Sequence, residues 1–153
     1  MALFFLTFKE TICISVMVKA NTKTSFYVQS EVSLVINSNP REMFNAFTGG
    51  LQSLSKTNGE QVRGFMDLLG ACYKPGALDL KTKELMSVAI AVYCRCEYCI
   101  VFHVHKALEA GAGRAEILEA AMVAVAFGGG PAMTYSVTLL KESLDEFEPD
   151  FTK

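Results

Sequence analysis

The sequence contains no tryptophan, only four prolines and no excess of charge of either sign. Its 14 basic and 16 acidic residues leave a formal net charge of −2 over 153 positions. Proteins that bind nucleic acid or an anionic surface normally present a basic field, and this composition has none. We therefore expect no nucleic-acid partner.

The apolar first 22 residues lack the features of a signal peptide and of a membrane span. No basic region precedes the apolar run, Lys9 and Glu10 interrupt it, and neither half approaches the ~20 residues that cross a bilayer. We expect no membrane partner.

Residues 25–36 alternate between apolar and polar side chains. Together with residues 12–18 they predict two short strands joined near residues 20–24. A lone hairpin is marginal in water, so this one would have to pack on helices or on another subunit. We predict an N-terminal extension over residues 1–38 that carries a short β-hairpin.

Cysteine is sparse except in one place. The five cysteines are an odd number, and three of them (Cys94, Cys96 and Cys99) fall within six residues. Disulfide frameworks of secreted domains are not built in this way, whereas a cytosolic thiol protein is. The pattern predicts a cytoplasmic location.

The length suits one domain with a real core, but the composition is apolar for that size. Hydrophobic residues make up 51% of the chain and charged residues only 20%. A small chain of this kind is expected to cover part of its surface with copies of itself. The composition therefore predicts a homo-oligomer.

Helical periodicity dominates from residue 39 onward. Asn39 before Pro40 and Asp79 before the third apolar stripe are helix-start signals, and glycines follow several of the expected ends. We predict an all-α bundle of about six helices over residues 39–153, closed by Pro149. The expected helices run over residues 40–54, 60–73, 80–93, 96–110, 114–127 and 131–147.

One stretch gathers the residues that a thiol redox site needs. It contains a C-x-x-C pair, Cys96 and Cys99, with His103 four residues after the second cysteine and Glu84 twelve before the first. Such chemistry requires a nucleophile, a second thiol that traps its oxidised form, and a proton relay. Glu84 belongs to a mainly apolar helix, which favours a buried acid that orients the histidine.

Helix geometry places these groups together. On the helix that begins near Cys96, the positions of Cys96, Cys99 and His103 lie along one face. Both cysteines fall in its first turn, where the helix N-terminus favours the thiolate. If residues 93–97 form the turn between antiparallel helices, Glu84 returns to the side of the thiols.

The pattern Glu-x11-Cys-x2-Cys-x3-His, formed by Glu84, Cys96, Cys99 and His103, resembles the alkylhydroperoxidase D (AhpD) motif of the carboxymuconolactone decarboxylase superfamily. The resemblance extends over roughly residues 40–147. Two further segments fit it, Glu109–Ile117 and Gly128–Pro131.

The resemblance implies an AhpD-like helical fold and a thiol-dependent antioxidant activity of peroxiredoxin type, acting on an alkyl hydroperoxide or a disulfide. It implies that Cys99 reacts with the peroxide, that Cys96 resolves it, and that Glu84 and His103 relay the proton. The reductant would be a dithiol, as in a lipoylated or thioredoxin-like protein. The family is commonly trimeric or hexameric, and residues 1–38 have no counterpart in it.

The residues by themselves leave two questions open. The helix end favours the more N-terminal Cys96 as first nucleophile, whereas contact with His103 favours Cys99. Glu97 beside Cys96 opposes thiolate formation and so favours disulfide reduction over peroxide reduction. Other functions remain: a decarboxylase or lactone-processing enzyme that needs no thiol, or a redox-sensing binding module.

A zinc site is the main competing use of the cysteines. It would need both His103 and His105 beside the thiols, but side chains two positions apart on a helix point about 200° apart. No second C-x-x-C completes a four-ligand set. We expect neither a metal nor a cofactor.

Overall fold

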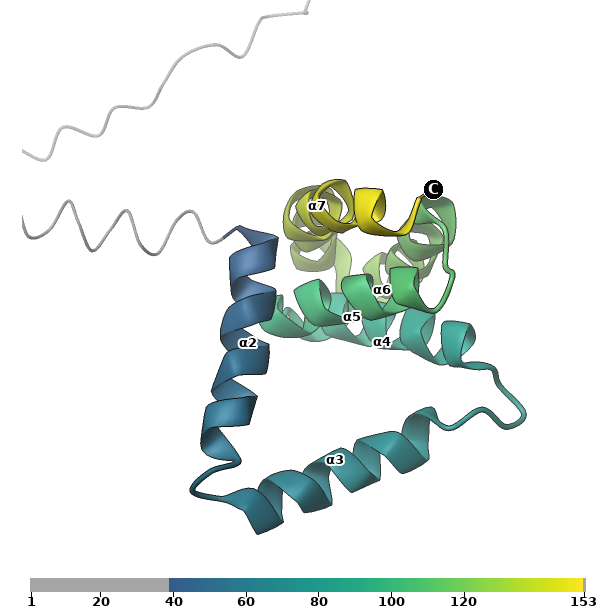
Figure 1. The fold of residues 1–153 in the computed structure, drawn as a ribbon. Coiled ribbons are helices and arrows are strands. Elements are labelled where there is room, and N and C mark those ends of the chain that lie inside the picture. The colour runs from purple at the N-terminus through teal and green to yellow at the C-terminus, as the bar shows by residue number, and fades with distance from the viewer. Residues whose placement is uncertain (1–38, 153) are drawn as a thin grey trace, which may run out of the picture. The chain divides into compact units, whose positions relative to one another are not determined.

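The computed structural model describes residues 39–152 of the chain, and Figure 1 shows these residues as an all-α fold. The predicted N-terminal strands and Cys13 lie outside the described residues, so the extension and its boundary stay predictions. The predicted all-α class is confirmed. The elements are α2 (Pro40–Leu54), α3 (Gly59–Tyr73), α4 (Leu80–Cys94), α5 (Glu97–Glu109), α6 (Arg114–Tyr135), the π-helix η1 (Ser136–Leu140) and α7 (Lys141–Phe151).

The helix starts follow the capping signals of the sequence. Asn39 caps α2, where its side-chain oxygen accepts a hydrogen bond from the backbone N–H of Arg41. Asp79 caps α4 by accepting a hydrogen bond from the backbone N–H of Thr82 at 2.7 Å. Hydrogen bonding with the side chain and the backbone of Thr82 holds the pKa of the Asp79 carboxyl below the ordinary value. The helix that carries Glu84 therefore begins at a defined residue.

The hydrophobic core lies where α4, α5, α6, η1 and α7 meet, and Figure 1 shows α4, α5, α6 and α7 gathered together. The apolar run of α4 buries the side nearest α5 and α6. Each buried aliphatic side chain contributes about 1.5–3 kcal/mol to folding, so this cluster fixes the frame that holds the site. Its largest fully buried apolar side chains are Val88, Val92, Ile100, Val101, Val104, Ile117, Leu140, Leu144 and Phe147.

Helices α2 and α3 attach to this core very differently. Helix α2 buries Met43, and Arg41 in its first turn pairs with Glu146 and Asp150 of α7. Helix α3 has no buried residue within the part of the chain that the structure describes, and Figure 1 shows it set apart from the core. It is tied to α4 where Tyr73 meets Ser87 (Oη···Oγ 2.5 Å).

The last third of the chain confirms one predicted helix boundary and corrects another. The predicted break at residues 128–130 is present at Gly129, where two helical segments of α6 meet at a kink and where φ of 60° and ψ of −145° suit glycine alone. Helix α7 passes Pro149 and ends at Phe151, so the expected stop at Pro149 is wrong. A proline in a last turn removes a single backbone bond while its fixed φ remains helical.

The stretch Arg114–Phe151 is long and apolar enough to cross a membrane, judged by length and composition alone. The core helix of a soluble protein meets the same criterion. Here the backbone kinks at Gly129, and Ile117, Leu144 and Phe147 are fully buried in the core. Only 22% of its most apolar 18-residue window is buried, and one such helix is weak evidence for a membrane span.

Candidate functional site

The turn between α4 and α5 places the cysteine pair. Arg95 adopts the left-handed conformation (φ 57°) that ends many helices, and the N–H of Cys96 donates to the carbonyl of Ala91 at 3.1 Å. Cys96 is the N-cap of α5, and Cys99 lies in its first turn. The turn is shorter than the predicted 93–97, and both cysteines lie at the helix N-terminus.

Cys96 and Cys99 are joined by a disulfide, with their Cα atoms 5.1 Å apart. Both side chains are half-buried. The other cysteines that the structure describes, Cys72 and Cys94, are exposed thiols. The C-x-x-C pair therefore forms a short disulfide at the N-terminus of α5.

The structure brings Glu84 to His103, as the sequence predicted. Nδ1 of His103 lies 2.8 Å from Oε2 of Glu84, across the α4–α5 contact. The Glu84 side chain is only 8% exposed and that of His103 20% exposed. A buried carboxylate bonded to one ring nitrogen orients the imidazole and leaves its other nitrogen to exchange a proton.

A pocket of about 440 Å³ opens beside this pair. Cys99, His103 and Glu84 line it, whereas Cys96 does not. The remaining lining side chains come from α2, α3 and α5 and are mostly apolar or aromatic. They are Phe47, Phe65, Met66, Leu69, Gly70, Tyr73, Tyr98, Phe102 and Lys106.

Tyr73 and Ser87 support the histidine and were not predicted from the sequence. The Tyr73 ring lies parallel to that of His103, with centroids 6.0 Å apart, and its hydroxyl pairs with Ser87. Burial raises the pKa of Tyr73 above the ordinary value. Ser87 lies three residues after Glu84, on the same face of α4, and that spacing was the signal available for finding it.

The carboxylate between the two cysteines has a partner of its own. The Tyr135 hydroxyl donates to Oε1 of Glu97 at 3.2 Å. Glu97 is exposed, so water screens its charge. Its expected opposition to thiolate formation is therefore reduced by solvent screening.

The two histidines diverge, as helix geometry predicted. His105 stacks on Phe44 of α2 at 4.3 Å between ring centroids, on the side of α5 away from Glu84. Among the described residues, no three histidine, cysteine or acidic side chains come together to hold a metal ion.

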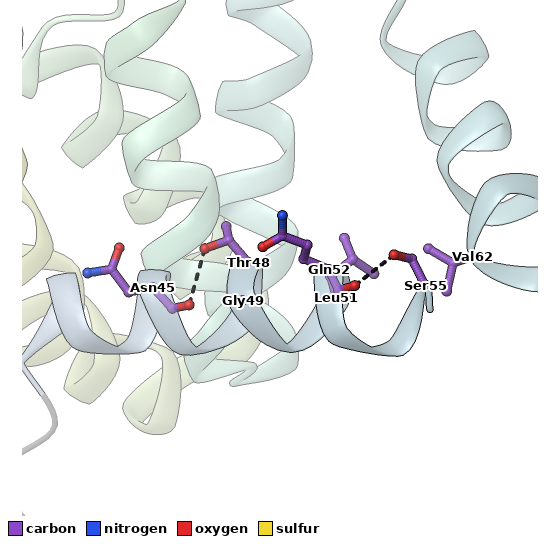
Figure 2. Close-up of a pocket in the computed structure, with 7 residues that line it drawn as sticks. All are labelled: Asn45, Thr48, Gly49, Leu51, Gln52, Ser55 and Val62. Carbon is purple, nitrogen blue, oxygen red and sulfur yellow. Dashed lines mark hydrogen bonds between the residues drawn. The ribbon is translucent and has the colours of Figure 1, made fainter. Parts of the chain in front are cut away.

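A second hollow, of about 540 Å³, lies along α2 and the start of α3 and is drawn in Figure 2. Thr48 and Ser55 on its wall bond to carbonyls of their own helix. None of the described residues that line it has a titratable side chain, so we assign no chemistry to it. Its lining residues are Asn45, Thr48, Gly49, Leu51, Gln52, Ser55 and Val62.

Comparison with known proteins identifies the family. Residues 60–142 match the model of the carboxymuconolactone decarboxylase family, so the chain belongs to that family. An uncharacterised protein of Cupriavidus necator is 31% identical over 84 residues, which cover 55% of this chain and 74% of the relative. An uncharacterised protein of the cox locus of Paracoccus denitrificans is 37% identical over 84 residues, which cover 55% and 75% of the two chains.

Two solved structures share the fold. The first is an apo carboxymuconolactone decarboxylase family protein from Legionella pneumophila. It is 38% identical with a TM-score of 0.67, and the match covers 76% of this chain and all of that one. The second is a family member from Thermotoga maritima with a suggested part in the antioxidative response. It is 34% identical with a TM-score of 0.58, and the match covers 70% and 93% of the two chains.

Proposed function

We propose that this chain is a thiol-dependent hydroperoxide reductase. The observation that carries the proposal is the position of Cys99. It alone of the disulfide pair lines the apolar pocket, and His103 and Glu84 line the same pocket. The suggested antioxidative part of the Thermotoga maritima relative agrees with this chemistry.

The reaction begins with the reduced pair. The Cys99 thiolate forms a bond to the terminal oxygen of the hydroperoxide, the O–O bond breaks, and the alkoxide leaves with a proton from His103. Glu84 holds the imidazole in place during this transfer. The Cys99 sulfenic acid then condenses with the Cys96 thiol, which releases water and gives the disulfide.

An external dithiol completes the cycle by thiol–disulfide exchange. One thiolate of the external dithiol attacks the disulfide and forms a mixed disulfide with one cysteine of the pair. The second thiol of the dithiol then releases that cysteine, so Cys96 and Cys99 are reduced and the external dithiol becomes a disulfide. We propose a lipoylated or thioredoxin-like protein as this reductant, and a cytoplasmic location where such dithiols are kept reduced. Because Cys96 lies outside the pocket, it is the sulfur that such a partner would meet.

The test counts thiols in protein that has first been reduced. One equivalent of cumene hydroperoxide should remove both thiols of the pair in the wild type and in a Cys72→Ser/Cys94→Ser control. Cys99→Ser should lose none, and Cys96→Ser should stop at a sulfenic acid that dimedone traps. Full peroxide turnover by Cys99→Ser would overturn the proposal.

The second candidate is acid–base chemistry of the decarboxylase or lactone-processing kind. The buried Glu84–His103 pair in an apolar pocket favours it, because such a pair can move a proton without any thiol. Alkylation of all thiols separates the two functions. Acid–base turnover should survive it, whereas peroxide reduction should cease.

A further inference from the structure

The pocket beside Cys99 has one charged feature that the proposed reaction does not use. Lys106 is the single lysine or arginine among the described residues that line it. Its ammonium lies 5.9 Å from the centroid of the Phe102 ring, above the apolar wall. The Lys106 side chain is 34% exposed, whereas the Glu84 side chain in the same pocket is only 8% exposed, so Lys106 lies nearer to solvent than Glu84.

The pocket wall is one face of α5. Cys99, Phe102, His103 and Lys106 follow one another at intervals of three, one and three residues, so they form a single stripe. Lys106 is seven residues from Cys99, which corresponds to about 10.5 Å along a helix axis. The reactive sulfur and the cation therefore stand two turns apart, with an aromatic ring between them.

We propose, on the basis of the function proposed above, that the substrate is an amphipathic organic hydroperoxide with a carboxylate, of the fatty-acid class. Its peroxide group meets Cys99, its hydrocarbon body lies on the aromatic and aliphatic wall, and its carboxylate pairs with Lys106. In the reaction the fatty-acid hydroperoxide becomes the corresponding hydroxy acid, while the dithiol of Cys96 and Cys99 becomes a disulfide and water is released.

The present partner of Lys106 does not prevent this pairing. Its ammonium contacts Oε2 of Glu109 at 2.5 Å, three residues along the helix, and the Glu109 side chain is 53% exposed. Exposed ion pairs of this spacing are weak and screened by salt. A carboxylate held beside the ring of Phe102 by its own buried chain competes well with such a pair.

The other carboxylate of the pocket favours the same orientation. Glu84 lies at the inner end, bonded to His103, so an acidic head group there would face a like charge. The polarity of the pocket thus directs an anionic group outward to Lys106. A neutral peroxide would gain the apolar contacts but no ion pair with Lys106.

The experiment compares linoleic acid hydroperoxide with its methyl ester in the wild type, Lys106→Met and Lys106→Arg. Methionine keeps the apolar stem and removes the charge, and arginine restores the charge. We expect Lys106→Met to raise KM for the acid about tenfold, the size of one lost hydrogen bond to a charged group. The ester should be unaffected, and Lys106→Arg should behave as the wild type.

A binding measurement separates this inference from the proposed function. Linoleate, which contains no peroxide, should bind the wild type about tenfold more tightly than Lys106→Met, again by the loss of one charged contact. If that difference appears without any peroxide turnover, the proposed function fails and the ligand class stands. If acid and ester respond equally to Lys106→Met, or if linoleate does not bind because a second copy fills the pocket, the inference is overturned.

Discussion

At the scale of single residues, His105 is the polar group least matched to its surroundings. Its Nδ1 is buried and has no hydrogen-bond partner within the described residues. Three aromatic rings enclose it: Phe44 stacks on it, and Phe147 and Phe151 meet it edge-on. A neutral imidazole suits this setting, whereas an imidazolium would lose its hydration there.

The charges around His105 do not reverse that preference. Burial is the main cause that lowers the pKa of His105 below its ordinary value. Glu109 and Asp150 oppose the shift, while Lys106 and Arg41 add to it. The folded protein therefore takes up the proton less readily than the unfolded chain does.

We predict that folding stability falls as the pH is lowered below about 6.5, the ordinary pKa of histidine. The sign follows because the unfolded chain binds the proton first, so the stabilising contribution is complete above that value and is lost below it. His105→Phe should remove this slope. Urea unfolding at pH 7.5, 6.5 and 5.5 measures it.

The matched control is Phe44→Leu, which weakens the aromatic enclosure but keeps the histidine. It should be less stable than the wild type at every pH and should still lose stability on acidification. An equal slope in the wild type and His105→Phe would assign the acid sensitivity to other groups.

Single residues also show what sequence could and could not predict at the site. Glu84, Cys99 and His103 were predicted to lie together because Cys99 and His103 are four residues apart on one helix, and a short turn returns the preceding helix, with Glu84, to their side. Tyr73 and Lys106 were not, because they matter through contacts that depend on where α3 lies and on which face of α5 borders the pocket. The position of α3 and the face of α5 that borders the pocket belong to the tertiary structure, which helical periodicity does not predict.

At the scale of elements, the kink in α6 is the least conventional piece of backbone. Gly129 combines φ 60° with ψ −145°, a region that is essentially confined to glycine, and no atom of the described residues lies within 4 Å of a Cβ built there. The cost of a substitution at this position is therefore conformational and not steric. Capping signals and the three glycines predicted the helix starts and the break in α6, but they could not predict the backbone angles at which the two helical segments join.

We predict that Gly129→Ala destabilises the fold by about 1–3 kcal/mol, the usual cost of holding a non-glycine residue in such a region. Gly130→Ala is the control, because its added Cβ also meets nothing within 4 Å and it has no positive φ. That variant should be neutral or slightly stabilising. The midpoint of urea unfolding compares the two, and equal losses would mean that the kink is not the cause.

At the scale of the whole molecule, apolar side chains gather on the outer side of α4 and α6. Six side chains line a hollow of about 270 Å³ there, none of them polar except for the tyrosine hydroxyl. Phe127 at its edge is 82% exposed, an unusual degree for a phenylalanine. The lining residues are Ala89, Ile90, Tyr93, Val123, Ala124 and Phe127.

We propose that this α4–α6 surface is where copies of the chain meet in the homo-oligomer, a trimer or hexamer, that the composition and the family resemblance predict. A contiguous apolar surface of this kind is rarely left in water by a folded protein. Nearby exposed side chains, Met86 and Met122, extend it along both helices. A closed assembly would bury these side chains and leave the Cys99 pocket, which α3 and α5 line, on another side of α4.

We therefore predict that Phe127→Glu dissociates the oligomer, because a buried, unpaired carboxylate in an apolar contact is strongly unfavourable. Leu54→Glu is the matched control. It places the same charge on an exposed leucine of α2, away from the α4–α6 surface, and should leave the mass unchanged. Sedimentation equilibrium of the reduced protein gives the masses. If the wild type is a monomer, or if both variants dissociate alike, the subunit contact lies elsewhere.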